Sequence, residues 1–229
     1  MKKHYSLLLA FLVAFSSIFV SCAEKEEFED FKKTYINGYE YVDLGLPSGL
    51  KWATCNVGAS TPEECGGYYA WGETEEKDNY SWSTYKWCNG SDDSMTKYCT
   101  DSSYGTVDNK TTLDPEDDVA HVKWGGSWRM PTNAEQDELL KNCTWNKTIQ
   151  NGVNGCKVTG PNGNSIFLPD AGFRSNAEVN GWGNCGGNWS SLLYSNDCHY
   201  ALDLISEISY NALYANERYL GLSVRPVCE

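Results

Sequence analysis

The pattern of apolar and polar positions divides the chain into three parts. An apolar run at positions 7–20 follows Lys2 and Lys3. This run is too short and too close to the start for a membrane-spanning helix, and it is typical of a signal peptide. The next segment, positions 23–33, holds five acidic residues and three lysines, which favours an extended, solvated tether. Beyond it, short alternating runs lie between glycine-rich turns.

Short strands are predicted on both sides of a helical region. Asn37-Gly38 is typical of a two-residue β-hairpin turn and is followed by an alternating run at 39–44. A second hairpin is expected where a turn at 160–164 separates two short apolar runs. The strands of this hairpin are expected at 156–159 and 165–168. Further strands are predicted at 50–55, 189–194, 198–204 and 220–227.

Two helices are predicted in the middle of the chain. Asp114 is suited to an N-cap and Pro115 to the first helical position, which predicts a short helix to about His121. Thr132 and Glu135 have the spacing of a capping box, so a second helix is expected from this point. Strands at both ends with helices between them predict an α+β domain.

A long segment between Gly72 and Thr106 contains no Val, Ile or Leu. Without aliphatic side chains it is expected to lie outside the core, and loops of this length are usually functional or mobile. Its aromatic rings have two interpretations: they form a platform that stacks on sugar rings, or they are the miniature core of the loop itself. The candidate ligand-binding residues are Tyr80, Trp82, Tyr85, Trp87 and Tyr98.

The end of the apolar run carries a candidate lipidation site. Cys22 follows Ser21 directly, in a context that resembles a bacterial lipobox. The expected organisation is a lipoprotein signal peptide at 1–21, a lipidated Cys22 with an acidic tether at 22–37, and a folded domain at 38–229. Cleavage by an ordinary signal peptidase, which would leave a secreted protein, is the alternative. The sequence Lys25-Glu26-Glu27 also resembles the signal by which Bacteroidetes lipoproteins reach the outer face of the cell.

The charge of the chain excludes two classes of partner. The 229 residues carry 18 basic and 31 acidic side chains, a formal charge of −13. Removal of the signal peptide takes away Lys2 and Lys3 and leaves a charge of −15. Nucleic acids and anionic membrane surfaces are bound through clustered Lys and Arg, so neither is an expected partner. Attachment to a membrane is expected only through the N-terminal lipid.

The cysteines leave several pairings open. If Cys22 carries lipid, nine of the ten cysteines remain, so at least one is unpaired within the chain. Cys88 and Cys99 bracket one polar loop and are the disulfide candidate. The chain has no Cys-x-x-Cys, and outside the signal peptide its histidines are His121 and His199. A zinc cluster or thioredoxin-like site is therefore not expected, and a Cys–His nucleophile pair has no particular support.

Two acidic clusters, Asp92-Asp93 and positions 114–118, are rich in oxygen ligands suitable for calcium. The second cluster is already explained by the start of a helix. EF-hand spacing is absent, as are the Glu-Pro-Asn and Trp-Asn-Asp motifs of calcium-binding lectins. No carboxylate pair stands in a recognisable catalytic context. We therefore expect no metal, no cofactor and no catalytic residue.

Several ordered motifs resemble one family over positions 39–227. The motifs at 42–53, 68–73, 125–132 and 223–227 are similar to the Fibrobacter succinogenes major paralogous domain of Bacteroidetes lipoproteins. That resemblance implies a C-type-lectin-like fold, with a twisted antiparallel sheet, two helices, termini close together and long loops on one side. It also favours a core role for five tryptophans, and Arg225 is expected to anchor the last strand. These tryptophans are Trp52, Trp71, Trp124, Trp128 and Trp189.

A fainter similarity, at 124–132 and Glu135, is to the formylglycine-generating enzymes, but nothing matches their oxidising cysteine pair, so an enzyme is not expected. We expect a lipid-anchored module of the outer membrane that binds a glycan or protein ligand through the 72–106 loop. Whether it faces the cell surface is left open. A structural or adhesive envelope component with no small ligand is the alternative. An enzyme is the third alternative.

Overall fold

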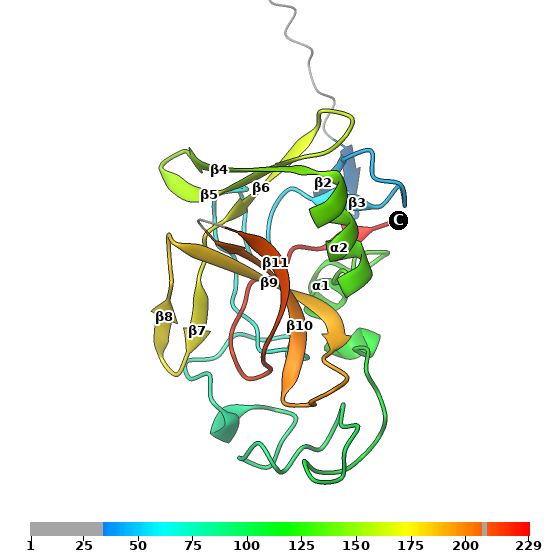
Figure 1. Ribbon diagram of the computed structural model, residues 1–229, viewed down its shortest axis with the longest axis vertical. Helices are drawn as coiled ribbons and strands as arrows, with labels where there is room; N and C mark the ends of the chain where they lie inside the picture. The colour runs from blue at the N-terminus through cyan, green and yellow to red at the C-terminus, as the bar shows by residue number, and fades with distance from the viewer. Residues whose placement is uncertain (1–33, 208–209) are drawn as a thin grey trace, which may run out of the picture. The chain divides into compact units, whose positions relative to one another are not determined.

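The computed structural model describes residues 34–207 and 210–229 (Figure 1). The predicted signal peptide at 1–21 and the lipidation site Cys22 lie outside the described residues. Antiparallel sheets and two short α-helices make up the fold, which confirms the predicted α+β class.

The first sheet brings the two ends of the domain together. Asn37 and Gly38 have φ angles of 49° and 85°, which is the left-handed geometry of the predicted hairpin turn. A strand precedes this turn, so the prediction that the tether extends to position 37 is wrong: the folded region already includes Thr34. The strand order is β1-β2-β3-β12, with β1 (Thr34–Ile36), β2 (Tyr39–Asp43), β3 (Lys51–Ala53) and β12 (Val227–Cys228).

A second sheet contains the predicted hairpin with its turn at 160–164. Thr159 pairs with Ser165 across this turn, as expected. The first strand of the sheet escaped prediction because its inward positions are mostly polar. The sheet has the order β4 (Thr144–Gln150), β5 (Val153–Thr159) and β6 (Ser165–Pro169), and a small separate ribbon joins β7 (Phe173–Ser175) to β8 (Glu178–Asn180).

The third sheet consists of three strands that follow one another in sequence. Its order is β11-β10-β9, with β9 (Cys185–Leu193), β10 (Tyr200–Glu207) and β11 (Asn211–Glu217). The first two strands were predicted and β11 was not. The prediction of a strand at 220–227 is wrong for most of this range. That segment instead makes isolated bridges, such as Leu222 to Tyr69, and only its end joins β12.

The helical region differs from prediction at its first helix. Pro115–Asp117 forms a single 3-10 turn, η2, and the helix α1 (Val119–Trp124) begins after it. The side chain of Asp118 accepts hydrogen bonds from the backbone N–H of Ala120 and His121, so Asp118 rather than Asp114 is the cap. The second helix, α2 (Asn133–Asn142), has the predicted capping box and contacts all three strands β9, β10 and β11.

All five motif tryptophans are buried, as expected. Their indole N–H groups tie separate segments together: Trp71 donates to the Ser190 carbonyl over 2.9 Å, and Trp189 donates to the Tyr69 carbonyl over 2.8 Å. Arg225 is also buried, and its guanidinium donates to four acceptors, three of them backbone carbonyls, which confirms its predicted anchoring role.

The aliphatic-free segment is part of the core, which corrects the expectation that it lies outside. Tyr80, Met95 and Tyr98 are buried in the same cluster as Trp71. The segment therefore uses aromatic rings and a methionine where other core segments use aliphatic side chains. It has one short 3-10 turn, η1 (Trp82–Thr84), and lies at the lower end of the view in Figure 1.

Candidate functional site

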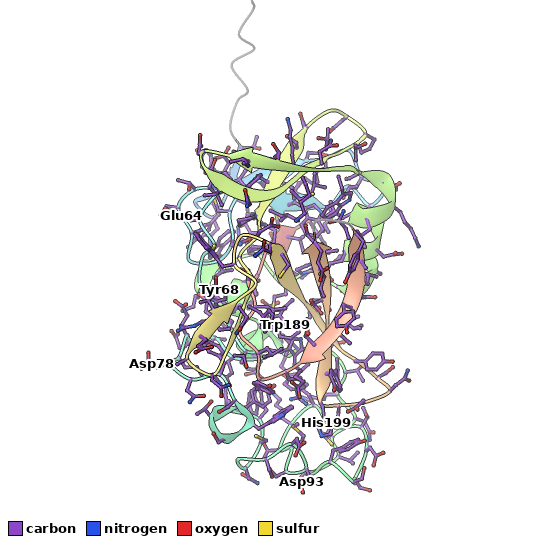
Figure 2. The ribbon with its side chains drawn as sticks, turned by 60° about the vertical axis from the view of Figure 1, so that its left-hand side comes forward. Glu64, Tyr68, Asp78, Asp93, Trp189 and His199 are labelled. Carbon is purple, nitrogen blue, oxygen red and sulfur yellow. The ribbon has the colours of Figure 1, made fainter. Side chains whose placement is uncertain are left out.

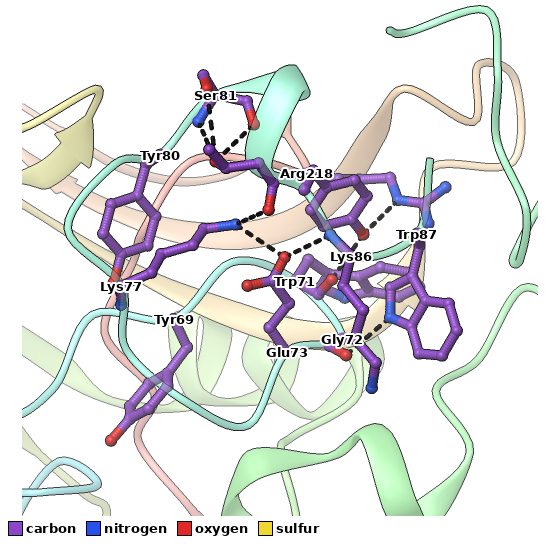
Figure 3. A network of polar contacts seen from close by, with 12 residues as sticks. Tyr69, Trp71, Gly72, Glu73, Lys77, Tyr80, Ser81, Lys86, Trp87 and Arg218 are labelled. Atoms are coloured by element: carbon purple, nitrogen blue, oxygen red, sulfur yellow. Dashed lines mark hydrogen bonds and ion pairs between the residues drawn. The ribbon is translucent and has the colours of Figure 1, made fainter. Parts of the chain in front are cut away.

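A buried arginine anchors the 72–106 segment to the rest of the domain. The Arg218 side chain has no exposed surface, and its Nε donates to the Tyr85 hydroxyl over 3.0 Å (Figure 3). Its Nη groups donate to the carbonyls of Lys97, Tyr98 and Cys198 at 2.8–3.0 Å. The guanidinium also lies 5.1 Å from the ring centroid of Trp71. Cation–π attraction and satisfied donors together offset the cost of burying this charge.

Two buried carboxylates continue this network. Glu73 accepts from the Lys77 ammonium and from the Lys86 backbone N–H, each over 2.8 Å (Figure 3). Asp117 accepts from the Tyr98 hydroxyl over 2.7 Å and from the Lys97 ammonium over 2.6 Å. These contacts hold the segment in one conformation and leave it little freedom to act as a mobile loop.

The five aromatic residues predicted to bind a ligand do not form a solvent-facing platform. Tyr80, Tyr85 and Tyr98 are at most 3% exposed, so no sugar ring can reach their faces. Trp82 and Trp87 are half-buried, and Trp87 donates its indole N–H to the Gly72 carbonyl over 2.8 Å. The platform prediction is therefore wrong for the three tyrosines. The rings pack on the main core rather than on a core of their own.

A cluster of half-buried rings links this segment to the β9–β10 connection. The His199 ring lies 5.7 Å from Trp82 and 4.2 Å from Tyr104, measured between ring centroids. Its Nε2 lies 2.9 Å from the Asp92 carbonyl, and Figure 2 shows His199 at the same end of the domain as Asp93. Tyr200, the next residue, follows at a centroid distance of 6.4 Å and leads into a hollow on the sheet.

This hollow, which we call the tyrosine groove, lies where the start of α2 meets the β10–β11 hairpin. Its volume is about 470 Å³, in the range of small-ligand sites. Leu202 pairs with Ala215 across the hairpin, so these two side chains share one face and give the groove an apolar floor. The lining residues are Asn133, Tyr194, Asp197, Tyr200, Leu202, Leu213, Tyr214 and Ala215.

Polar groups converge on the tyrosine groove. Asn133 lines the groove, and its Nδ2 is buried without a hydrogen-bond partner among the described residues. Asp197 lies with Oδ1 2.9 Å from His199 Nδ1. Burial, together with the charges of Glu217 and Asp197, raises the pKa of Tyr200, so its hydroxyl stays protonated at neutral pH. The groove thus combines flat rings with a carboxylate, an amide and phenolic hydroxyls.

The sequence reasoning missed this groove. Five tyrosines lie between positions 194 and 219, but only Tyr200 and Tyr214 lie on strands, and the other three lie in connecting segments. Tyr200 lies on β10 and Tyr214 on β11, a strand that was not predicted, and both are among the residues that line the hollow.

The predicted disulfide does not match the structure. All nine cysteines of the described residues are free thiols. Cys88 Sγ lies 3.1 Å from the Trp82 carbonyl, whereas Cys99 Sγ lies 3.4 Å from Cys198 Sγ. The backbone of Cys88 forms an isolated bridge with Met95, and Met95 forms another with Gly105.

Asp114 and Asp118, two of the acidic residues suited to calcium, already have partners. Asp114 contacts the ammonium groups of Lys97 and Lys110 at 2.6 and 2.5 Å, and Asp118 caps α1. Within residues 34–207 and 210–229, no group of three or more His, Cys, Asp or Glu side chains is placed to hold a metal ion. None of the helices in these same ranges combines the length and apolar character that a membrane crossing requires.

Comparisons of the chain with protein-family models, curated proteins and solved structures found no match.

Proposed function

We propose that this chain is a non-catalytic, lipid-anchored binding module of the cell envelope, and that it binds a glycan in the tyrosine groove. The observation that carries the proposal is the groove itself, where Tyr200 and Tyr214 line a hollow with an apolar floor. Flat aromatic faces suit the C–H surfaces of sugar rings. The amide of Asn133 and the carboxylate of Asp197 suit sugar hydroxyls, as a donor and an acceptor.

The state of the thiols supports a non-catalytic role. A nucleophilic cysteine needs a lowered pKa, because the thiolate is the reactive form. Burial acts in the opposite direction here and raises the pKa of Cys143 and of Cys198 to about 11. It also raises the pKa of Cys88, Cys156, Cys185 and Cys228.

We extend the proposal to a C-type-lectin-like arrangement. Antiparallel pairing of β12 with β3 places the start and end of the described domain in one sheet, and two helices accompany the sheets. A long, irregular insertion at positions 72–113 lies between the first and the later strands. These features agree with the family that the sequence motifs resemble.

The anchor and the location are proposed from the sequence. Cys22 behind the apolar run would carry the lipid, and the Lys25-Glu26-Glu27 segment would direct the protein to the cell surface. Palmitate labelling of the full chain and of Cys22→Ser tests the lipid. Protease treatment of intact cells then tests surface exposure, since only outward-facing protein is cleaved.

A glycan array tests the function. The full chain in detergent is compared with Tyr200→Ala and with Trp182→Ala, whose indole is 65% exposed and lies outside the groove-lining set. We expect wild type and Trp182→Ala to retain the same glycans and Tyr200→Ala to lose them. Absence of retained glycans for the folded wild-type chain would favour the structural or adhesive alternative. Retention by all three proteins would place binding outside the groove.

A further inference from the structure

Cys99 and Cys198 are neighbours in space although 99 positions separate them in sequence. Their sulfur atoms lie 3.4 Å apart, and both side chains are wholly buried. Cys99 belongs to the aliphatic-free segment, and Cys198 belongs to the connection between β9 and β10. No other pair of sulfur atoms in the described residues is in contact at this distance or closer.

Independent contacts fix the backbones that carry these two thiols. One guanidinium nitrogen, Nη1 of Arg218, donates to the carbonyl of Tyr98 over 2.9 Å and to the carbonyl of Cys198 over 2.8 Å. The Asp108 carboxylate accepts from the backbone N–H of Tyr98 and Cys99 at 2.9 and 3.0 Å. The two cysteines are therefore held together by the fold and not by the flexibility of their side chains.

We propose that Cys99 and Cys198 are the site of a disulfide that forms when the chain is exported, a step that rests on the export proposed above. The sulfur atoms need to approach by only about 1.4 Å to reach the S–S bond length of about 2.05 Å. Oxidising compartments permit such bonds, whereas the cytosol keeps thiols reduced.

The reaction needs a disulfide oxidant, such as a thiol oxidase of the envelope or oxidised glutathione. One cysteine thiolate attacks the oxidant disulfide, forms a mixed disulfide and releases one thiol of the oxidant. The second cysteine then attacks its partner's sulfur, which forms the Cys99–Cys198 bond and releases the second oxidant thiol. Two electrons and two protons pass from the cysteines to the oxidant. Because both thiols are buried in the folded domain, the bond forms during folding and is afterwards shielded from reductants.

The disulfide would also brace the ligand site. Asp197 and Tyr200, which line the tyrosine groove, flank Cys198 in the chain. A bond from Cys198 to Cys99 ties this wall of the groove to the buried segment around Tyr98. The linkage thus stabilises the local arrangement on which glycan binding depends.

Peptide mapping tests the pairing. The reduced, unfolded full chain is refolded in detergent with a glutathione redox buffer, free thiols are blocked with N-ethylmaleimide in denaturant so that buried thiols also react, and the protein is digested. Trypsin alone leaves Cys185 and Cys198 in one peptide, because no Lys or Arg lies between Arg174 and Arg218. Chymotrypsin is therefore added to cut after Trp189. We expect a linked pair of peptides, one with Cys99 and one with Cys198, that separates on reduction.

Matched variants give a second readout. Cys99→Ser and Cys198→Ser should each lower the Tm of chain refolded in the redox buffer by about 5–10 °C, and should change much less the Tm of chain refolded and kept in reductant. Cys143→Ser, a change at a half-buried thiol elsewhere, should show the same Tm offset with and without reductant. Blocked Cys99 and Cys198 thiols after refolding, or their linkage to other cysteines, would overturn the proposal.

The same mapping on chain isolated from the cell envelope separates this proposal from that of export. A bond found after refolding but missing in envelope protein would support the pairing and contradict export to an oxidising compartment. Its absence in both samples would overturn the pairing and leave the glycan proposal to its own array test.

Discussion

Arg218 donates a hydrogen bond from Nε to the hydroxyl of Tyr85 over 3.0 Å, and neither side chain is appreciably exposed to solvent. The two residues are 133 positions apart. Tyr85 in turn donates its hydroxyl proton to the Trp71 carbonyl over 2.7 Å. This contact joins the aliphatic-free segment to the turn after β11, and it explains how a segment without Val, Ile or Leu becomes part of the core.

Arg218→Met should destabilise the domain strongly. The methionine retains apolar volume but leaves the Tyr85 hydroxyl and three buried carbonyls without their donor, at a cost of about 3 kcal/mol or more in unfolding free energy. Urea unfolding followed by tryptophan fluorescence measures the loss. The control is Lys141→Met, at a surface ion pair with Asp137, for which we expect a loss of no more than about 0.5 kcal/mol. Equal losses in the two variants would refute the anchoring role.

Stability should fall as pH rises from about 4 to about 8 because of Asp203. Burial raises the pKa of this carboxyl from 3.8 to about 7, opposed by the Asn216 side chain, which donates to Oδ2 over 3.2 Å. The folded state therefore binds the proton more tightly than the unfolded state. The resulting stabilisation is complete below the unfolded pKa and is lost as pH rises through the folded pKa, by up to about 4 kcal/mol.

Asp203→Asn isolates this contribution, because the amide resembles the neutral acid and does not titrate. Urea unfolding at pH 5 and pH 8 should show a clearly smaller pH effect in Asp203→Asn than in wild type. Asp137→Asn, at the protein surface, serves as the control and should keep the wild-type pH effect. A wild-type chain that is equally stable at both pH values would contradict the prediction.

Thr132→Ala should weaken the start of α2. The Thr132 hydroxyl accepts from the backbone N–H of Glu135 over 3.3 Å, and Glu135 returns a bond of 2.7 Å to the Thr132 N–H. Loss of this cap costs about 1 kcal/mol in unfolding free energy. Thr132→Ser keeps the hydroxyl and should lose much less, so an equal loss for serine and alanine in thermal unfolding would assign the effect to packing of the methyl group.

Local signals predicted a large part of the fold. The Asn37-Gly38 turn, the capping box of Thr132 and the core tryptophans depend on residues that are close in sequence or on bulky apolar side chains, and the structure has all of them. The start of α1 was misplaced because both Asp114 and Asp118 suit an N-cap. Only Asp118 also accepts from the Met130 backbone N–H, a contact between distant residues that no local pattern reveals.

The site was harder to predict because it depends on pairing between strands. An aromatic residue in a polar segment can face solvent or pack on the core, and the sequence leaves both open. Arg218, more than 100 positions away, donates hydrogen bonds to the Tyr85 hydroxyl and the Tyr98 carbonyl in the core. The β10–β11 register pairs Leu202 with Ala215 at the floor of the groove, and no local pattern reveals this pairing. Contacts between residues so far apart in sequence explain why the predicted platform tyrosines are buried.

The tyrosine groove makes a quantitative prediction at Tyr214, a groove-lining residue that is 54% exposed. Removing a ring that stacks on a sugar costs about 1–1.5 kcal/mol, which is about five- to tenfold in affinity. Because the ring is largely exposed in the free protein, its loss should leave folding intact.

The most direct test of the glycan site is isothermal titration of the tightest glycan from the array into the full chain, Tyr214→Ala and Trp182→Ala. The groove predicts a Kd about five- to tenfold weaker for Tyr214→Ala and unchanged within about twofold for Trp182→Ala. A Tyr214→Ala chain that is folded and binds within twofold of wild type would contradict the assignment of the groove as the glycan site.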